Sequence, residues 1–502
     1  MKSFNEVQKT RQSYHRDPAT RAVHRSSLLV PELAGATASI SFLNHFLLKR
    51  NYEDVACKIS SVAANGQLIN AVTIAIAEPR VYTITPSELL GGRANMYVVE
   101  FFCTKNLFVP FPAVMINHLG GDFLNSIHSY NRVFNDVFEN DAINAINVPE
   151  ASIDVELGEN YEPFFVFCSG MLPFNDNIPV RLDGPHGRVT REFPVEIPKL
   201  AHRTITLGDS LRAPESSAAK VMRIAQPPQF MFYGRLLVGT RDVSSGAFSA
   251  NHSYYDSSTV REYWPNAQPS FRTYPLIPGF GMAIRMYPIM SPGTLQVSID
   301  ACDSSGKQHN IFDGELTSPS AAFIDVDVSR RLAEASIATA AISVSACATT
   351  GNTPTRVSHQ IVYYDLHARS RLQASINVSL TAQNTFQPAG KTSQSWGQVI
   401  LGKNYRSGMG FSFNNPGGEP GEVTVQFYGQ AGEFLKKSFS LAPASSWCIT
   451  GTALLEALQA ADFDCAEIEP VWYFARSPRA DLTGYAAQSH LQSGHTSGEH
   501  SF

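Results

Sequence analysis

The sequence predicts an all-β protein made of four tandem antiparallel β-sandwich units with short helical connectors. One pattern occurs four times. It consists of a hairpin turn centred on glycine, an alternating strand, and a short turn that ends in leucine. The hairpin glycines recur at intervals of 121, 119 and 126 residues: Gly66, Gly187, Gly306 and Gly432. Short strands at regular spacing, separated by turn signals, are typical of sandwiches, and such a repeat determines the whole fold.

A chain of 502 residues is too long for one core and should divide into several domains. The repeat places them at residues 37–149, 150–270, 271–377 and 378–502, after a basic, flexible N-terminal arm at residues 1–36.

Each unit contains its own strand signals. In the first unit, residues 55–62 and 67–77 alternate around Asn65-Gly66, a dipeptide that favours a hairpin. Residues 164–167 form a buried strand in the second unit, and the clearest strands of the third are residues 294–301, 322–328 and 340–346. In the fourth unit, residues 423–428 and 434–441 flank Gly432. Helical segments of 10–15 residues do not alternate with these strands, which argues against a βαβ fold.

Composition excludes several classes of function. The net charge is −5 and basic residues form no stripe, so nucleic acid is not an expected partner. No apolar run approaches the roughly 18 residues of a membrane-spanning helix. The seven cysteines are odd in number, lie mostly in apolar strands and form no CxxC pair. These features predict reduced thiols in a cytoplasmic protein and argue against a zinc ribbon.

Four histidines near the ends of the units are candidate ligand-binding residues: His118, His252, His359 and His490. Each follows an asparagine or a serine, as His252 follows Asn251. The functional interpretation is a repeated ligand contact at the end of the last strand. The alternative is a structural histidine whose ring bonds a loop carbonyl in each sandwich.

The second unit has the richest of these segments, running from His252 to Asp256. Alternation along a strand would place His252, Tyr254 and Asp256 on one face. An imidazole, a phenol and a carboxylate together could hold a sugar through hydrogen bonds and ring stacking. The alternative is an aromatic edge that packs onto the next domain.

The same segment carries a family resemblance. A unit with a glycine-turned hairpin and a closing strand that runs into His-x-x-x-Asp resembles the β-sandwich family of the sensory rhodopsin transducer. His252 and Asp256 match this motif, and His118 with Asp122 matches its spacing, whereas His359 and His490 lack the aspartate. The resemblance implies a β-sandwich that assembles into oligomers and binds sugars.

The C-terminal segment is a candidate metal site. It contains His490, His495, Glu499 and His500, which are residue types that bind zinc or another divalent metal. Their spacing fits no single helical face, so a loop would have to wrap the ion. The alternative is a polar tail rich in glycine and serine.

These observations favour a non-enzymatic binding or assembly protein that forms homo-oligomers, with carbohydrate as the candidate partner and no cofactor. No catalytic residue is predicted, because GxSxG, HExxH and P-loop motifs are absent from the sequence. Two alternatives remain open. One is a metal-dependent enzyme that uses the C-terminal histidines, and the other is a viral or phage-like structural component.

Overall fold

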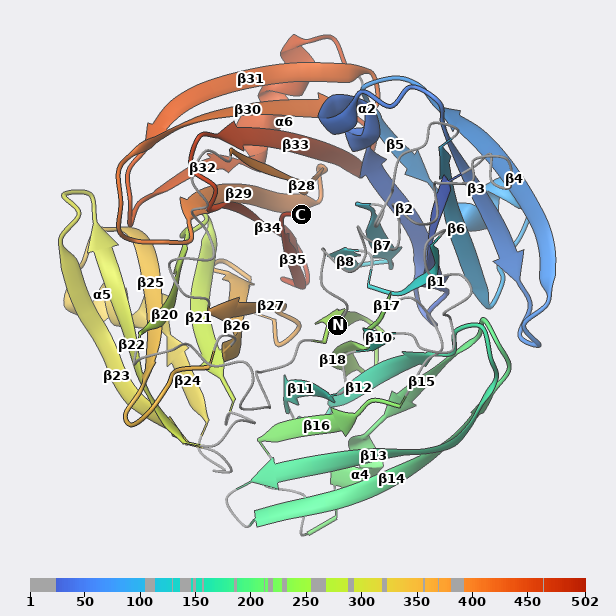
Figure 1. Ribbon diagram of the computed structural model, residues 1–502, viewed down its shortest axis with the longest axis horizontal. Coiled ribbons are helices and arrows are strands. Elements are labelled where there is room, and N and C mark those ends of the chain that lie inside the picture. Colours follow the sequence, from blue (N-terminus) through green and yellow to red (C-terminus); the bar gives the residue numbers. More distant parts are fainter. Residues whose placement is uncertain are drawn as a thin grey trace, which may run out of the picture.

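The computed structural model confirms an all-β fold of repeated sandwich-like units. The structure describes these residues: 24–103, 113–128, 130–135, 146–147, 150–155, 158–184, 187–211, 213–214, 220–227, 233–253, 268–287, 293–317, 323–354, 357–368, 370–380, 392–463 and 465–502. Four units surround a common centre, and the chain passes through them in order (Figure 1). Among the described helices, none has the length and apolar character that a membrane crossing requires.

Each unit contributes eight strands to two four-stranded antiparallel arrays. If the eight are named a to h in chain order, one array has the order a-f-c-d and the other e-b-g-h, and a short helix connects e to f. All four units share this order. The c–d and g–h pairs are hairpins. The repeat in the sequence therefore corresponds to a repeat of topology.

The elements of the first and second units have the following bounds. The first unit contains β1 (His24–Pro31), β2 (Thr37–Leu43), α2 (His45–Arg50), β3 (Val55–Val62), β4 (Leu68–Ile76), β5 (Val81–Ile84), α3 (Pro86–Leu89), β6 (Met96–Cys103), β7 (Met115–Leu119) and β8 (Leu124–His128). The second contains β11 (Glu150–Asp154), β12 (Tyr161–Cys168), β13 (Phe174–Gly184), β14 (Gly187–Ile197), β15 (His202–Thr206), α4 (Gly208–Leu211), β16 (Val221–Ala225), β18 (Leu237–Asp242) and β19 (Phe248–His252). Three short strands extend the a-f-c-d sheet of the first unit: β9 (Arg132–Asn135), β10 (Ile146–Asn147) and β17 (Tyr233–Gly234).

The third and fourth units contain the same series. The third has β20 (Ser270–Tyr274), β21 (Phe280–Met286), β22 (Thr294–Asp303), β23 (Gln308–Thr317), β24 (Ile324–Asp327), α5 (Val328–Ala335), β25 (Thr339–Ala348), β26 (Val357–Asp365) and β27 (Ala374–Leu380). The fourth has β28 (Ser393–Leu401), β29 (Tyr405–Phe413), β30 (Gly421–Gly429), β31 (Gly432–Leu441), β32 (Ser446–Thr450), α6 (Gly451–Ala460), β33 (Glu469–Ser477), β34 (Leu482–His490) and β35 (Thr496–His500).

The four repeated glycines lie at equivalent places, as the sequence predicted. Each lies at the turn of its unit's c–d hairpin, and all four have positive φ angles, from 79° to 124°. Side chains with a Cβ atom rarely adopt this conformation, so glycine suits the turn. The short helices also follow strand e in every unit. Thr450 caps α6 by accepting a hydrogen bond from the backbone N–H of Ala453.

Two predicted boundaries need correction. The N-terminal arm was expected to reach residue 36, but residues 24–31 form β1, the first strand of the first unit. Leu28, Leu29 and Val30 are fully buried there, because this apolar run completes the core. The boundary at 377/378 falls inside β27, which pairs with β26 as far as Leu380 and so belongs to the third unit.

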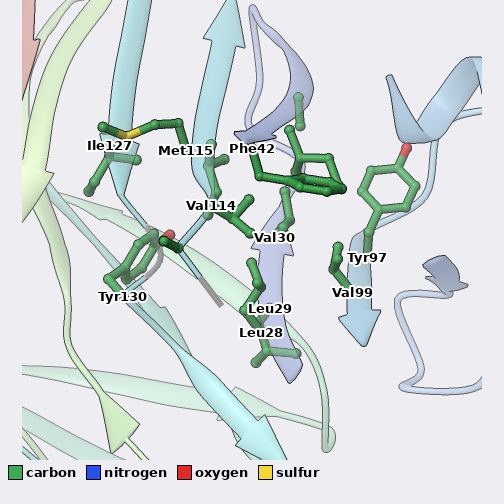
Figure 2. Close-up of a cluster of buried hydrophobic side chains, with 14 of the residues drawn as sticks. Leu28, Leu29, Val30, Phe42, Tyr97, Val99, Val114, Met115, Ile127 and Tyr130 are labelled. Carbon is green, nitrogen blue, oxygen red and sulfur yellow. The ribbon is translucent and has the colours of Figure 1, made fainter. Parts of the chain in front are cut away.

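Apolar cores fill the sandwiches. The second and fourth units each contain a cluster of their own, and the cluster of the third unit also takes in Tyr485 and Ala487 of the fourth. The first unit's cluster is larger and reaches its neighbours, because it includes Phe248 of the second unit and Trp472 of the fourth. Figure 2 shows part of it, with Leu28, Leu29 and Val30 near Phe42 and Val99. The units are therefore packed against one another by buried apolar surface, the main source of folding stability.

Candidate metal centre

The last strands of the four units meet at the centre of the molecule. β8 contacts β19, β19 contacts β27, β27 contacts β35, and β35 contacts β8, which closes a ring (Figure 1). Each of these strands is the outer strand of its own sheet and leaves backbone groups unpaired on one side.

Polar side chains satisfy these backbone groups across the ring. Asn125 Oδ1 accepts a hydrogen bond from the Ala250 N–H at 2.7 Å. Ser497 Oγ accepts one from the Ser126 N–H at 2.8 Å. The central ring is therefore a buried polar seam between the units, and buried polar groups require such partners.

One position of this ring is repeated in all four units. The strand registers pair His128 with Met115, His252 with Leu237, Asn377 with Gln360, and His500 with Tyr485. The pairing continues to strand b of each unit, where Ser41, Val166, Arg285 and Gly410 occupy the same place. The four positions His128, His252, Asn377 and His500 are thus structurally equivalent, and three of them are histidines.

These three histidines and Glu499 form a compact cluster, which we call the hub. One potential ligand atom from each of the four side chains lies within 4.8 Å of the other three. Glu499 precedes His500 on β35, while His128 and His252 come from β8 and β19. The hub therefore joins three units. His252 is fully buried, and Glu499 is 3 % exposed.

Glu499 contacts two other members of the hub, His128 and His500. Its Oε2 lies 3.2 Å from His128 Nδ1 and 3.4 Å from Asn251 Nδ2, and its Oε1 accepts a hydrogen bond from the His500 N–H at 2.9 Å. Burial alone would raise the pKa of Glu499, but the imidazoles of His128 and His500 outweigh burial and hold that pKa below its usual value. The carboxylate is therefore charged at neutral pH.

Two of the histidines are held neutral. Burial lowers the pKa of His500 to about 4, although Glu499 acts in the opposite direction. Burial also brings the pKa of His252 well below its usual value, with help from His128 and Arg235. Because metal ions bind the neutral imidazole, such burial favours coordination.

Hydrogen bonds on the far side of the rings fix their orientation. His500 Nδ1 lies 2.8 Å from the Ser501 carbonyl oxygen and donates to it, so that Nε2 carries the lone pair. His252 Nδ1 lies 3.1 Å from the Ser253 carbonyl oxygen and 2.8 Å from a guanidinium nitrogen of Arg235. Arg235 can only donate and the Ser253 carbonyl can only accept, so Nδ1 cannot satisfy both at once. Nε2 would become the ligand atom only if Arg235 moved away and Nδ1 donated to Ser253.

The hub residues fit a zinc-type ion. Zinc takes imidazole nitrogens and carboxylate oxygens at about 2.0–2.2 Å, which places tetrahedral ligand atoms about 3.3 Å apart. The 3.2 Å between His128 Nδ1 and Glu499 Oε2 matches that separation. His128 Nδ1 is buried, and the carboxylate oxygen that it contacts belongs to the hub, so an ion between the two atoms would take both as ligands. With three histidines and one glutamate, all four tetrahedral positions would be filled by protein.

The structure separates the four residues that the sequence grouped as a metal cluster. Glu499 and His500 belong to the hub, but His490 and His495 lie at the other end of the β34–β35 hairpin. The His490 N–H donates to the His495 carbonyl oxygen across the hairpin turn, and His495 Nδ1 lies 3.9 Å from Asp122 Oδ2. Because β35 is extended, its two ends cannot share one ion.

The four closing histidines are not equivalent to one another, contrary to the sequence prediction. His118, His359 and His490 lie on strand g of their units, whereas His252 lies on strand h. His118 and His359 are fully buried. His118 Nε2 lies 3.3 Å from the Pro31 carbonyl oxygen, and His359 Nε2 lies 2.5 Å from the Tyr274 hydroxyl.

The predicted sugar-binding face falls partly outside the described residues. Tyr254 and Asp256, the aspartate of the His-x-x-x-Asp motif, lie outside them. Asn251 and His252 are within the described part, and both point into the central seam. Asn251 contacts Glu499, and His252 is a hub residue.

Sequence reasoning missed His128, although a signal for it exists. The equivalent positions His128, His252, Asn377 and His500 are separated by 124, 125 and 123 residues. These intervals are more regular than those between the hairpin glycines. The asparagine at the third position conceals the pattern from a search for histidines alone.

Comparisons with known proteins add little to this description. No protein-family model matches the chain, and no curated protein matches it. Among solved structures, the chain was compared with a tetra-tandem repeat in the extending region of a large adhesion protein. That comparison covers 94 % of this chain and 97 % of the other at 9 % identity, but its TM-score of 0.09 is too low to support any inference.

Proposed function

We propose that this chain is a non-enzymatic binding protein that holds one divalent transition metal ion, zinc by ligand preference, at the hub of its four units. The observation that carries the proposal is the convergence of His128, His252, Glu499 and His500 from three units within 4.8 Å. Such an ion would fasten the closing strands of those units to one another.

The ligand set favours a structural ion over a catalytic one. Catalytic zinc sites have three protein ligands and leave a fourth position open for water or substrate, whereas structural sites are closed. Four protein ligands at the hub make a closed site, in which His252 and Glu499 are buried and His128 and His500 are partly exposed. A metal-dependent enzyme, the alternative raised by the sequence, would need an open ligand position and access for a substrate.

Carbohydrate is not part of this proposal. The strand-end side chains that suggested it include His118, His252 and His359, and these are all fully buried against protein groups. The proposal includes a cytoplasmic location. It is supported by six described cysteines with free thiols: Cys57, Cys168, Cys302, Cys347, Cys448 and Cys465.

Metal titration of purified protein tests the proposal. The chain is stripped with a chelator and then titrated with zinc, or with cobalt(II), whose visible spectrum reports tetrahedral coordination. We expect one ion per chain, and a thermal stability that increases with metal concentration, because a ligand that binds only the folded state stabilises it by mass action.

Three variants locate the site. His128→Ala and Glu499→Gln should each weaken binding by more than the roughly 10–100-fold that loss of a supporting group costs. His490→Ala is the matched control, because it removes a histidine of the same hairpin that lies outside the hub. Unchanged affinity in His128→Ala, or loss of the ion only in His490→Ala, would show that the hub is not the metal site.

A further inference from the structure

A second candidate site lies between the second and third units. A small cavity is bounded on one side by β18 and β19, and on the other by β21, β26 and β27. Its volume is about 30 Å³, more than the roughly 10–15 Å³ that one enclosed water requires. The cavity can therefore enclose a small group, but not a whole sugar ring.

The charge of the cavity is positive. Among the described residues that line it, two are arginines, Arg285 and Arg371, and none carries a carboxylate. Asp325 on β24 is a counter-charge, whose Oδ1 lies 3.4 Å from Arg285 Nε and whose side chain is 45 % exposed. An ion pair that is exposed to water on one side offsets the positive charge of a guanidinium only weakly.

Two lining side chains have polar atoms without a protein partner. Gln360 Oε1 and Ser375 Oγ are buried, and neither forms a hydrogen bond with the described residues. Gln360 is 1 % exposed. Buried polar groups are nearly always paired, so a ligand or a water is expected here. Both side chains can donate, since the serine has a hydroxyl and rotation of the glutamine amide presents its NH₂ group.

We infer that this cavity binds the oxyanion end of a small ligand, a carboxylate or a phosphate. The planar guanidinium of arginine matches the oxygens of both groups and binds them in pairs. Arg285 would contact the oxyanion from β21, and Gln360 and Ser375 would donate to its remaining oxygens. Arg371 is exposed, so it lies where the cavity meets solvent and where the rest of the ligand would extend.

This inference does not depend on the metal. Asn251 lines the cavity and also lies 3.4 Å from Glu499 Oε2, which makes the two sites neighbours. Anion binding is therefore measured on protein saturated with zinc and again on protein treated with chelator, so that failure of one site leaves the other testable.

Calorimetric titrations with inorganic phosphate, sulfate and acetate at constant ionic strength test the inference. We expect at least one of them to bind, and Arg285→Ala to weaken that binding by about tenfold or more, because a charge-assisted pair of hydrogen bonds is lost. Tighter binding of phosphate than of acetate would identify a phosphate ligand, and the reverse a carboxylate. Arg330→Ala is the control, because Arg330 is an exposed arginine on α5 of the same unit.

A second variant keeps the inference testable if Arg285→Ala fails to fold. Gln360→Glu places a carboxylate inside the cavity, where it should occupy the position of the anion. We expect this variant to melt at a higher temperature in anion-free buffer and to lose the response to added anion. The inference is overturned if no anion binds below about 10 mM, which is weaker than typical specific affinities. It is equally overturned if Arg285→Ala and Arg330→Ala bind alike, or if Gln360→Glu keeps the wild-type response.

Discussion

Acid should unfold this protein, because buried histidines remain neutral in the folded state. Burial lowers the pKa of His45 and His118 to about 4 and that of His359 to about 3, and hydrogen bonds to backbone carbonyls only partly oppose it. Unfolding returns each pKa to about 6.5. Between these limits the unfolded chain binds more protons than the folded one, so stability is complete above pH 6.5 and declines as the pH falls toward 4.

The size of the effect follows from these shifts. Near pH 5 each of the three histidines should take up about 0.9 proton on unfolding, which makes the free energy of unfolding fall by roughly 4 kcal/mol per pH unit. Over the whole window the loss is roughly 10 kcal/mol at 1.36 kcal/mol per pKa unit, comparable to the total stability of an ordinary domain. We therefore expect cooperative unfolding before pH 4.

Urea titrations at pH 7.5, 6.5, 5.5 and 4.5, followed by tryptophan fluorescence and circular dichroism, measure this slope. His359→Gln should reduce the number of protons taken up on unfolding by about one, and so make the slope shallower. Ile361→Val on the same strand should instead lower the free energy of unfolding by about 1 kcal/mol equally at every pH. Indicator dyes in weak buffer count the protons taken up directly. A folded protein at pH 4, or a slope that His359→Gln leaves unchanged, would refute the argument.

Two further outcomes are expected. Gly494→Ala should lower the melting temperature much more than Gly432→Ala: both glycines have positive φ, but a Cβ at Gly494 would lie 1.9 Å from the Ala368 carbonyl oxygen, whereas one at Gly432 meets no described atom within 4 Å. Equal losses would show that the crowding at Gly494 is relieved. Thiol titration without reductant should find seven free thiols in denaturant. In the native protein Cys57 and Cys168 should react slowly, because burial raises the pKa of both thiols, that of Cys168 to about 12. A thiol count below seven in freshly isolated protein would indicate a disulfide.

The fold was largely predictable because it depends on local signals that repeat. A glycine in a hairpin turn and alternating apolar residues act over a few positions, so Gly66 and its three counterparts identified the same hairpin in every unit. The first strand was missed for the opposite reason. Leu28 to Val30 follow a basic segment, and only the packing of the first sandwich shows that this short apolar run is fully buried.

The hub was only partly predictable because it depends on how the units pack. Glu499 and His500 were identified by their residue types, and His252 by its motif, but as members of separate sites. Their convergence arises only when β8, β19 and β35 close the central ring. Proximity in sequence misled the prediction about His490 and His495, since both precede β35, and the hub residues Glu499 and His500 lie at the far end of that extended strand.

The differences among the four equivalent positions are informative. A ring of four identical subunits would carry the same side chain at all four places on its axis. In a tandem chain each place can change independently. The third position is Asn377, whose amide donates to the His252 carbonyl oxygen at 2.7 Å and so holds β27 against β19 without using an ion.

Glu499 compensates for the histidine that the third unit lacks. It precedes the fourth equivalent position, His500, and brings a negative charge to a buried group of imidazoles. A carboxylate offsets one of the two positive charges of a divalent ion, which four neutral histidines could not do, and burial makes that compensation necessary. Because the units are fused into one chain, the hub can carry an asymmetric set of three histidines and one glutamate. The replacement Glu499→His should bind zinc more weakly than the wild type, although it restores an imidazole.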